Sequence, residues 1–119
     1  MYSVQSSGCA PIVRAFEKHL ENAPEWEAAQ TSAWGLRVPR ANGDRLMLRA
    51  LRESNGGAVA VEESEIEPAA AELRTKEGID AGPEGGAALL ALRRLMENGE
   101  IAEGETVVLF NTGGNKYHT

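Results

Sequence analysis

The stretch that decides the predicted fold is Thr106-Val107-Val108-Leu109-Phe110-Asn111-Thr112-Gly113-Gly114-Asn115-Lys116. Its first five residues are β-branched, aliphatic or aromatic and lack polar alternation, which predicts a strand buried on both faces, as in a parallel sheet covered by helices. The Asn-Thr-Gly-Gly run that follows is typical of a turn. Ligands of such sheets bind beyond the carboxyl ends of the strands, so Thr112 is the first candidate for a contact with a small molecule. The alternative is a strand that ends in a glycine turn and binds nothing.

Before this stretch, the chain alternates strands and helices. Short runs of strand-forming residues bounded by glycine or serine predict two more strands, over residues 2–6 and 58–61. Helical spacing of apolar residues predicts four helices, over residues 11–22, 44–53, 64–76 and 83–97. Residues 25–42 are compatible with a short helix or with a packed loop. The element order predicts a single partial domain over residues 1–119, of the α/β class, with three layers and a short, mainly parallel sheet covered by helices.

The apolar spacing also predicts which face of each helix is buried. In the helix over residues 44–53, the residues expected to point inward are Leu46, Met47, Ala50 and Leu51. In the helix over residues 83–97, they are Ala88, Leu89, Leu92, Leu95 and Met96.

Composition narrows the class of protein. The chain has 119 residues, of which 42% are hydrophobic and 25% charged, as expected for a soluble globular domain. Its net charge of −6 argues against a nucleic-acid partner, because phosphates need basic side chains to neutralise them. No run approaches the roughly 18 apolar residues that span a bilayer, so we expect a cytoplasmic protein without a membrane partner. The single cysteine, Cys9, excludes an internal disulfide and a cysteine-based zinc site.

Three local features admit a functional and a structural interpretation. Ser6-Ser7-Gly8 precedes a helix and resembles an anion site, or else it is an ordinary turn. Cys9 is a possible nucleophile, although no base is paired with it in sequence, and a small buried residue is the favoured interpretation. The acidic run could form a metal cluster, but a helix N-terminus that favours negative charge explains it better; its members are Glu62, Glu63, Glu65 and Glu67.

Five blocks in the same order resemble the C-terminal third of bacterial threonine synthase, a fold type II pyridoxal-phosphate enzyme. The blocks are Tyr2-Ser3-Val4-Gln5-Ser6-Ser7-Gly8-Cys9-Ala10-Pro11-Ile12, Gly35-Leu36-Arg37-Val38-Pro39, Gly43-Asp44 with Leu48-Arg49-Ala50-Leu51-Arg52-Glu53-Ser54, Pro83-Glu84-Gly85 with Ala87-Ala88-Leu89, and Val108-Leu109-Phe110-Asn111-Thr112-Gly113. Gly113-Gly114-Asn115 departs from the more usual Gly-Ser-Gly-Leu run. The resemblance implies the C-terminal part of the large domain of such an enzyme.

The resemblance also implies pyridoxal phosphate as the cofactor and names residues around it. By position, the Thr112 hydroxyl would meet the pyridine nitrogen, with Asn111 and Gly113 beside it in the same turn. A Gly-Leu-x-x-Pro loop lies beside the cofactor ring in relatives, so Gly35 and Leu36 inherit that contact. Pro-Glu-Gly lies near the ring edge, which makes Glu84 a further candidate. Taken alone, Glu84 is a first-turn glutamate that complements the helix dipole.

A lysine suited to the chemistry is missing. In the family, a lysine of a Ser-Phe-Lys-Asp block forms the Schiff base with the cofactor, and an earlier glycine loop holds its phosphate; this sequence contains neither. Its lysines are Lys18, Lys76 and Lys116, of which the first two are expected on exposed helix faces. Lys116 matches a different family position. We therefore expect no catalytic residue in this chain.

Three functions follow from these observations. The first is a C-terminal piece of threonine synthase, which converts O-phosphohomoserine and water to threonine and phosphate, inactive without its complement. The second is a non-catalytic binding or assembly module that kept the scaffold. The third is a doubly wound nucleotide or anion binder, which no Gly-x-Gly-x-x-Gly or Gly-Lys-Ser pattern supports. Apolar edges left uncovered predict self-association or a complementary chain that carries the N-terminal residues.

Overall fold

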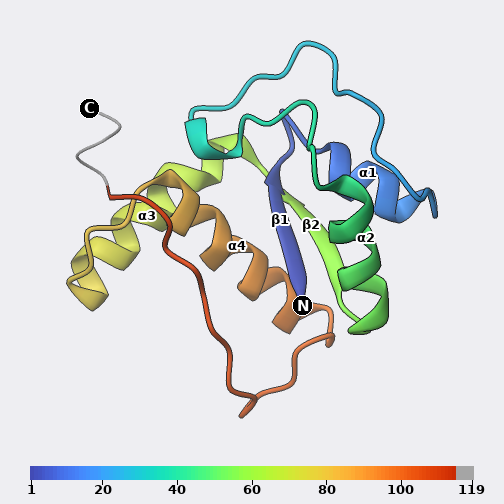
Figure 1. Cartoon of the computed structure of the whole chain (residues 1–119). Helices are drawn as coiled ribbons and strands as arrows, with labels where there is room; N and C mark the ends of the chain where they lie inside the picture. Colours follow the sequence, from blue (N-terminus) through green and yellow to red (C-terminus); the bar gives the residue numbers. More distant parts are fainter. Residues whose placement is uncertain (115–119) are drawn as a thin grey trace. The chain divides into compact units, whose positions relative to one another are not determined.

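The computed structural model describes residues 1–114, which form two compact units (Figure 1). The first unit is Met1–Glu63, and the second begins at Ser64 and is described as far as Gly114. Lys116 and the expected loose tail 117–119 lie outside the described residues. No helix in residues 1–114 combines the length and the apolar character that crossing a membrane requires.

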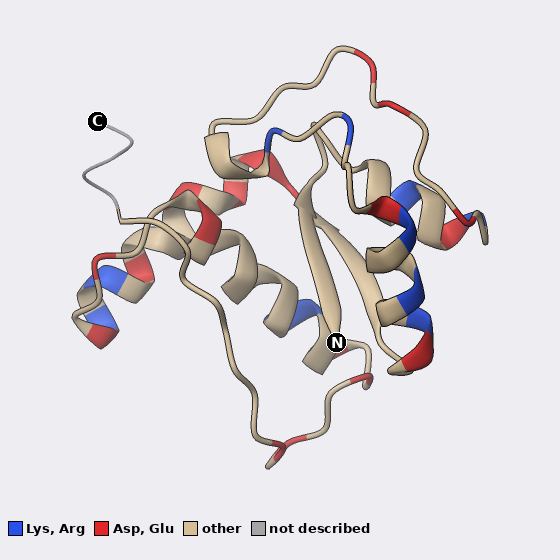
Figure 2. Cartoon of the chain, in the orientation of Figure 1, with Lys and Arg blue, Asp and Glu red and all other residues tan. Residues whose placement is uncertain are grey.

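Two parallel strands form the centre of the first unit. β1 (Tyr2–Ser6) pairs with β2 (Gly57–Val61), with Tyr2 opposite Gly57 and Ser6 opposite Val61. Neither strand carries a charged residue (Figure 2). Parallel strands need a long crossover, and here it contains α1 (Pro11–Glu17), a short 3-10 helix η1 (Trp34–Leu36) and α2 (Asp44–Glu53). The strands predicted over residues 2–6 and 58–61 and the α/β class are confirmed.

The beginning of α1 is fixed by a strand residue. Pro11 occupies the first helical position, where its missing N–H is not needed. The Gln5 side chain, 8% exposed, reaches across from β1, and its Oε1 accepts hydrogen bonds from the backbone N–H of Ile12 at 2.9 Å and of Val13 at 3.1 Å. The helix ends at Glu17 rather than near Asn22, because the chain turns at His19, whose φ is 59°.

The core of the first unit consists of Ile12, Ala15, Ala23, Leu48 and Leu51, from α1, α2 and the segment between them. The predicted inward face of α2 is partly wrong, because Leu46 and Met47 are 69% and 42% exposed while Leu48 is buried. The reason lies one turn earlier. The Asp44 carboxylate accepts a hydrogen bond from the backbone N–H of Ala23 at 2.9 Å, which turns the face of Asp44, Leu48 and Leu51 toward the core.

The second unit contains α4 (Pro83–Glu97) and all of α3 (Glu63–Glu77) except Glu63, which belongs to the first unit; each helix has fifteen residues. Gly86 permits their close approach, since a Cβ atom added there would overlap the carbonyl oxygen of Ile66 and lie 2.8 Å from the backbone nitrogen of Ala70. This contact turns the face of Ala87, Ala91 and Leu95 inward. The predicted burial of Leu95 is confirmed, whereas Met96 is 45% exposed and its predicted burial is wrong. The other three residues predicted to point inward are half-buried: Ala88, Leu89 and Leu92.

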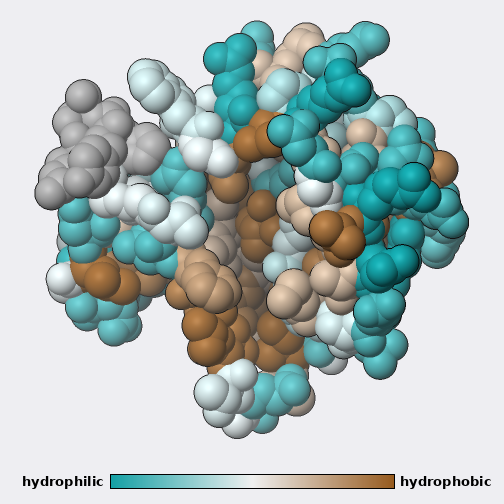
Figure 3. All heavy atoms as spheres, viewed as in Figure 1, coloured by the Kyte–Doolittle hydropathy of each residue, from teal (hydrophilic) through white to brown (hydrophobic). Residues whose placement is uncertain are grey.

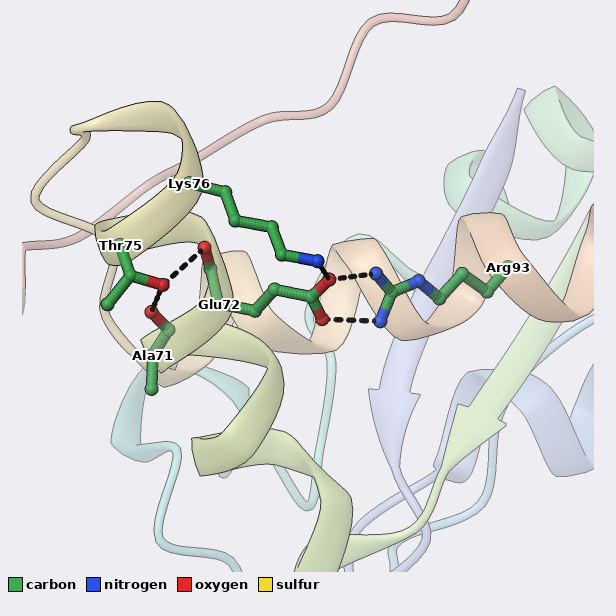
Figure 4. A network of polar contacts seen from close by, with 5 residues as sticks. All are labelled: Ala71, Glu72, Thr75, Lys76 and Arg93. Carbon is green, nitrogen blue, oxygen red and sulfur yellow. Dashed lines mark hydrogen bonds and ion pairs between the residues drawn. The ribbon is translucent and has the colours of Figure 1, made fainter.

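A charged network also joins α3 to α4 (Figure 4). The Arg93 guanidinium donates to both carboxylate oxygens of Glu72, at 2.8 and 2.6 Å, and Lys76 Nζ donates to Glu72 Oε1 at 2.8 Å. Hydrogen bonds from Arg93 and Lys76 lower the pKa of Glu72 to about 2, against a smaller opposing effect of desolvation. Glu72 is therefore ionised at neutral pH.

The strand predicted over residues 106–110 is not observed. These residues lack regular secondary structure, and Val108 and Phe110 are 75% and 78% exposed instead of buried. A strand needs a neighbouring backbone to satisfy its N–H and C=O groups, and no described residue forms a backbone ladder with this segment. The apolar composition is nonetheless real: the segment from Thr106 to Gly114 carries no charge (Figure 2), and apolar side chains gather on the face over its course (Figure 3).

Candidate functional site

In the second unit, the Asn-Thr-Gly turn lies against the N-terminus of α4. The backbone N–H of Gly82 donates to the carbonyl oxygen of Gly113 at 2.9 Å. A Cβ atom added at Gly85 would lie 2.5 Å from Asn111 Oδ1, so glycine at this position leaves room for the Asn111 side chain. The structure thus brings together the Pro-Glu-Gly and Asn-Thr-Gly motifs, which lie far apart in the sequence.

The candidate side chains at this junction differ in accessibility. Glu84 is 8% exposed, and its Oε2 is inaccessible to solvent, although it lies in the first turn of α4. Thr112 is exposed and Gly113 half-buried. A buried acid therefore lies in the helix turn that contacts the Asn-Thr-Gly turn, and the threonine of that turn is exposed.

In the first unit, Gly35 and Leu36 belong to η1, where Gly35 is exposed and Leu36 half-buried. The loop that carries them, residues 30–38, runs past the carboxyl ends of β1 and β2 (Figure 1). The backbone N–H of Gln30 donates to the carbonyl oxygen of Gly8 at 3.0 Å, and a Cβ atom on Gly8 would overlap the carbonyl of Gln30. The carboxyl edge of the parallel pair is thus lined by this loop, as expected for a ligand site in an α/β sheet.

A carboxylate at the end of β2 completes that edge. Glu63 Oε2 accepts a hydrogen bond from the buried Ser6 hydroxyl at 2.5 Å, and Oε1 accepts from the backbone N–H and hydroxyl of Ser32 at 2.5 and 2.7 Å. Burial alone would raise the pKa of Glu63, but hydrogen bonds from Ser6, Ser32 and Thr31 together lower it to about 2. The interpretation of Glu63 as a residue that only complements the helix dipole is therefore too narrow.

The anion site suggested for Ser6-Ser7-Gly8 is contradicted by Gln5. The N–H groups of Ile12 and Val13, which an anion would need, already bond to Gln5 Oε1. Ser6 is engaged as well, because its hydroxyl donates to Glu63 and accepts from the backbone N–H of Gly8 at 3.2 Å. Nothing in the sequence pattern identified Gln5 as a capping residue.

Cys9 is fully buried, and desolvation raises the pKa of its thiol against the lowering effects of the Val38 backbone N–H and the Arg37 charge. A raised pKa lowers the thiolate fraction at neutral pH, which agrees with a packing role.

A surface hollow of about 470 Å³ in the first unit is lined by residues that include Arg14, Lys18 and Trp26. The Arg14 guanidinium lies 4.8 Å from the centroid of the Trp26 ring and donates to the carbonyl oxygens of Pro24 and Glu25 at 2.8 and 3.2 Å. These contacts already use Arg14, and none of the sequence-predicted site residues lines the hollow. We therefore assign Arg14 and Trp26 to the packing of this surface.

Comparison with known proteins gives the family of the chain. Residues 1–113 match the family model described as pyridoxal-phosphate dependent enzyme. The chain is 34% identical to threonine synthase from Methanosarcina acetivorans, 33% to that from Methanocaldococcus jannaschii and 34% to that from Halalkalibacterium halodurans. Each match covers 95% of this chain but only 28%, 28% and 30% of the relative, so the chain spans less than a third of their length.

The fold is also found in a solved structure. The crystal structure of T.th. threonine deaminase superposes with a TM-score of 0.63 and 24% identity, over 83% of this chain and 34% of that one. This likeness concerns the fold alone. The resemblance to threonine synthase and the type II fold class are confirmed, and the chain belongs to the pyridoxal-phosphate dependent enzyme family.

Proposed function

We propose that this chain is the C-terminal part of a threonine synthase, the pyridoxal-phosphate lyase that converts O-phosphohomoserine and water to threonine and phosphate. The observation that carries the proposal is the match to threonine synthases over 113 residues, 95% of the chain. The meeting of the Pro-Glu-Gly and Asn-Thr-Gly motifs in the second unit supports it, because the resemblance assigns both to one cofactor ring. In this proposal, the chain is a single partial domain that works in the cytoplasm.

The residues present fit one side of such a cofactor. Thr112 is exposed, so its hydroxyl is available to a pyridine nitrogen. The turn that carries Thr112 is held by the hydrogen bond from Gly82 to Gly113, and the absence of a side chain at Gly85 lets Asn111 pack against α4. A neutral hydroxyl partner would leave that nitrogen unprotonated. Pyridoxal phosphate, when bound, supplies the electron sink, and the protein orients the reacting groups.

The remaining candidates are the residues near the ring edge and the ring face. Glu84 is held in the first turn of α4 with its carboxylate shielded from solvent. Gly35 and Leu36 lie in a loop anchored at the carboxyl edge of β1 and β2. We assign the cofactor-binding set as Thr112, Asn111, Gly113, Glu84, Gly35 and Leu36.

By itself the chain is proposed to be inactive, because its described lysines are unsuited to attack an aldehyde. Lys76 is exposed, and its Nζ donates to the Glu72 carboxylate at 2.8 Å, so it is held against α3 rather than directed at a cofactor. Lys18 is exposed at the C-terminus of α1. In this proposal, the lysine belongs to the part of the relatives that this chain does not cover.

The exposed segment 106–110 supports the idea of a complementary chain. Its apolar side chains are partly or largely exposed: 39% for Val107, 75% for Val108, 37% for Leu109 and 78% for Phe110. The segment has no regular secondary structure and no charged side chain. Such a segment favours pairing with an added strand. We propose the complementary N-terminal polypeptide as that partner, and self-association is the outcome expected where the partner is absent.

Complementation tests the proposal. The chain is co-expressed with the N-terminal part of the Methanosarcina acetivorans threonine synthase that it does not cover, and phosphate release from O-phosphohomoserine and retained pyridoxal phosphate are measured. We expect both signals in the pair and neither in the chain alone. Thr112→Val should lower phosphate release and Thr112→Ser should restore it, while Thr75→Val, the same change at an exposed position of α3, should change little.

Two results would contradict the proposal in different ways. Covalent binding of pyridoxal phosphate together with phosphate release by the chain alone would show that the proposed inactivity is wrong. A folded pair that neither associates nor retains pyridoxal phosphate would reject the threonine synthase assignment. That result would favour the alternative, a non-catalytic binding or assembly module that keeps the scaffold.

A further inference from the structure

Glu63 joins three separate parts of the first unit. It follows β2 and is the first residue of α3. One carboxylate oxygen accepts from Ser6, the last residue of β1, at 2.5 Å, and the other accepts from Ser32 at 2.5 and 2.7 Å. The same side chain thus links the carboxyl ends of both strands to the 30–38 loop.

The bonds to Glu63 are of the strong kind. Hydrogen bonds to an ionised carboxylate are about twice as strong as neutral ones, and Ser6 is fully buried. A neutral contact holds the start of the same loop, where the Gln30 N–H donates to the carbonyl oxygen of Gly8 at 3.0 Å. Ser32 lies two residues after this contact and just before Gly35 and Leu36, so loss of its bonds would free the part of the loop that carries them.

We propose that Glu63 is a positioning residue that holds the 30–38 loop, and with it Gly35 and Leu36, preformed at the carboxyl edge of β1 and β2 for contact with the cofactor ring. The part that concerns the cofactor rests on the proposed function, because that function assigns Gly35 and Leu36 to the ring. The part that concerns the loop rests on the hydrogen bonds alone. A preformed loop favours binding because less conformational freedom is lost when the ligand arrives.

A simpler role for Glu63 is to complement the dipole of α3. Glu65 provides the matched control, because it is an exposed glutamate in the same first turn. Glu65→Gln removes the same charge from the same helix end, whereas Glu63→Gln also removes an acceptor that Ser6 and Ser32 use. A dipole effect would make the two variants alike, and the positioning role would separate them.

Hydrogen exchange of the chain alone tests the loop. Peptides that cover residues 30–38 are followed by mass spectrometry in the wild type, Glu63→Gln and Glu65→Gln. We expect exchange about tenfold faster or more in Glu63→Gln, from the usual contribution of hydrogen bonds to charged groups, and wild-type exchange in Glu65→Gln. Ser32→Ala is the second variant, in case Glu63→Gln does not fold. It removes only the hydroxyl bond and keeps the carboxylate and the backbone bond, so its exchange rate should lie between those of the wild type and of a loop without these bonds.

The complemented protein tests the link to the cofactor. Titration with pyridoxal phosphate should give a weaker dissociation constant for Glu63→Gln than for Glu65→Gln. Equal loop exchange in Glu63→Gln and the wild type would overturn the positioning role. A loosened loop with unchanged pyridoxal phosphate affinity would overturn its role toward the cofactor, while the proposed function would stand. Failure of the wild-type pair to bind pyridoxal phosphate would instead overturn the proposed function, and loop exchange alone would then decide the role of Glu63.

Discussion

Gly86→Ala should loosen the packing of α3 against α4. A Cβ atom at this position would overlap the carbonyl oxygen of Ile66 and lie 2.8 Å from the nitrogen and 3.1 Å from the Cβ of Ala70. Two of these three atoms belong to the α3 backbone, which cannot rotate away as a side chain can. The new methyl group can be accommodated only if the two helices separate or bend.

The expected magnitude is a difference of two effects. Inserting a methyl group into a packed contact costs about 1–3 kcal/mol, while replacing glycine by alanine inside a helix gains about 1 kcal/mol. We therefore expect the free energy of unfolding to fall by about 1 kcal/mol. With a urea m-value of about 1–3 kcal/mol per molar, the unfolding midpoint should fall by roughly 0.3–1 M.

Urea unfolding followed by two probes checks this prediction. Far-ultraviolet circular dichroism reports on the helices, whereas fluorescence reports on Trp26 and Trp34, the two tryptophans of the chain, which both lie in the first unit. A larger shift by circular dichroism than by fluorescence would place the damage in the second unit.

Gly85→Ala is the matched control. It lies next to Gly86 in α4 and gains the same helix propensity, but its added Cβ would meet the end of the Asn111 side chain, which can move. We expect its free energy of unfolding to equal or exceed that of the wild type. If Gly86→Ala proved as stable as Gly85→Ala, the close backbone approach of α3 and α4 would be refuted.

Three further predictions concern single side chains. Gln5→Leu leaves the N–H groups of Ile12 and Val13 without their acceptor and should lower the free energy of unfolding by about 1–3 kcal/mol in urea titrations, whereas no loss would refute the cap. The Cys9 thiol should react with a thiol reagent in urea but hardly in the native protein, and rapid native labelling would contradict its burial. The pKa of Glu72 is lowered from 4.5 to about 2, so the stabilisation that its ionised form provides is complete above about pH 4.5 and is lost as pH falls toward 2. Glu72→Gln should therefore flatten the acid side of the curve of unfolding free energy against pH. An unchanged curve would count against the ion-pair network.

Several elements could be predicted because their signals are local. Pro11 and Pro83 mark helix starts, Asn98-Gly99 follows the end of α4, and the apolar run before Glu62 is β2. These signals depend on backbone preferences within a few residues, and those preferences are the same wherever the segment packs. The expectation that the Pro-Glu-Gly and Asn-Thr-Gly motifs lie close together came from family resemblance, since no local rule joins distant turns.

Packing decided the rest. Composition alone marked residues 106–110 as a strand, but a strand also requires a neighbouring backbone, and no described residue supplies a ladder. The inward face of α2 depended on the bond from Ala23 to Asp44, and the cap of α1 depended on Gln5, which precedes that helix in another element. The amino-acid order determined which segments become helices, the two paired strands and the family, because these are carried by short-range patterns. Only the tertiary structure decided which faces are buried and which polar groups meet, because a hydrogen bond between distant segments exists only once the chain has brought them together.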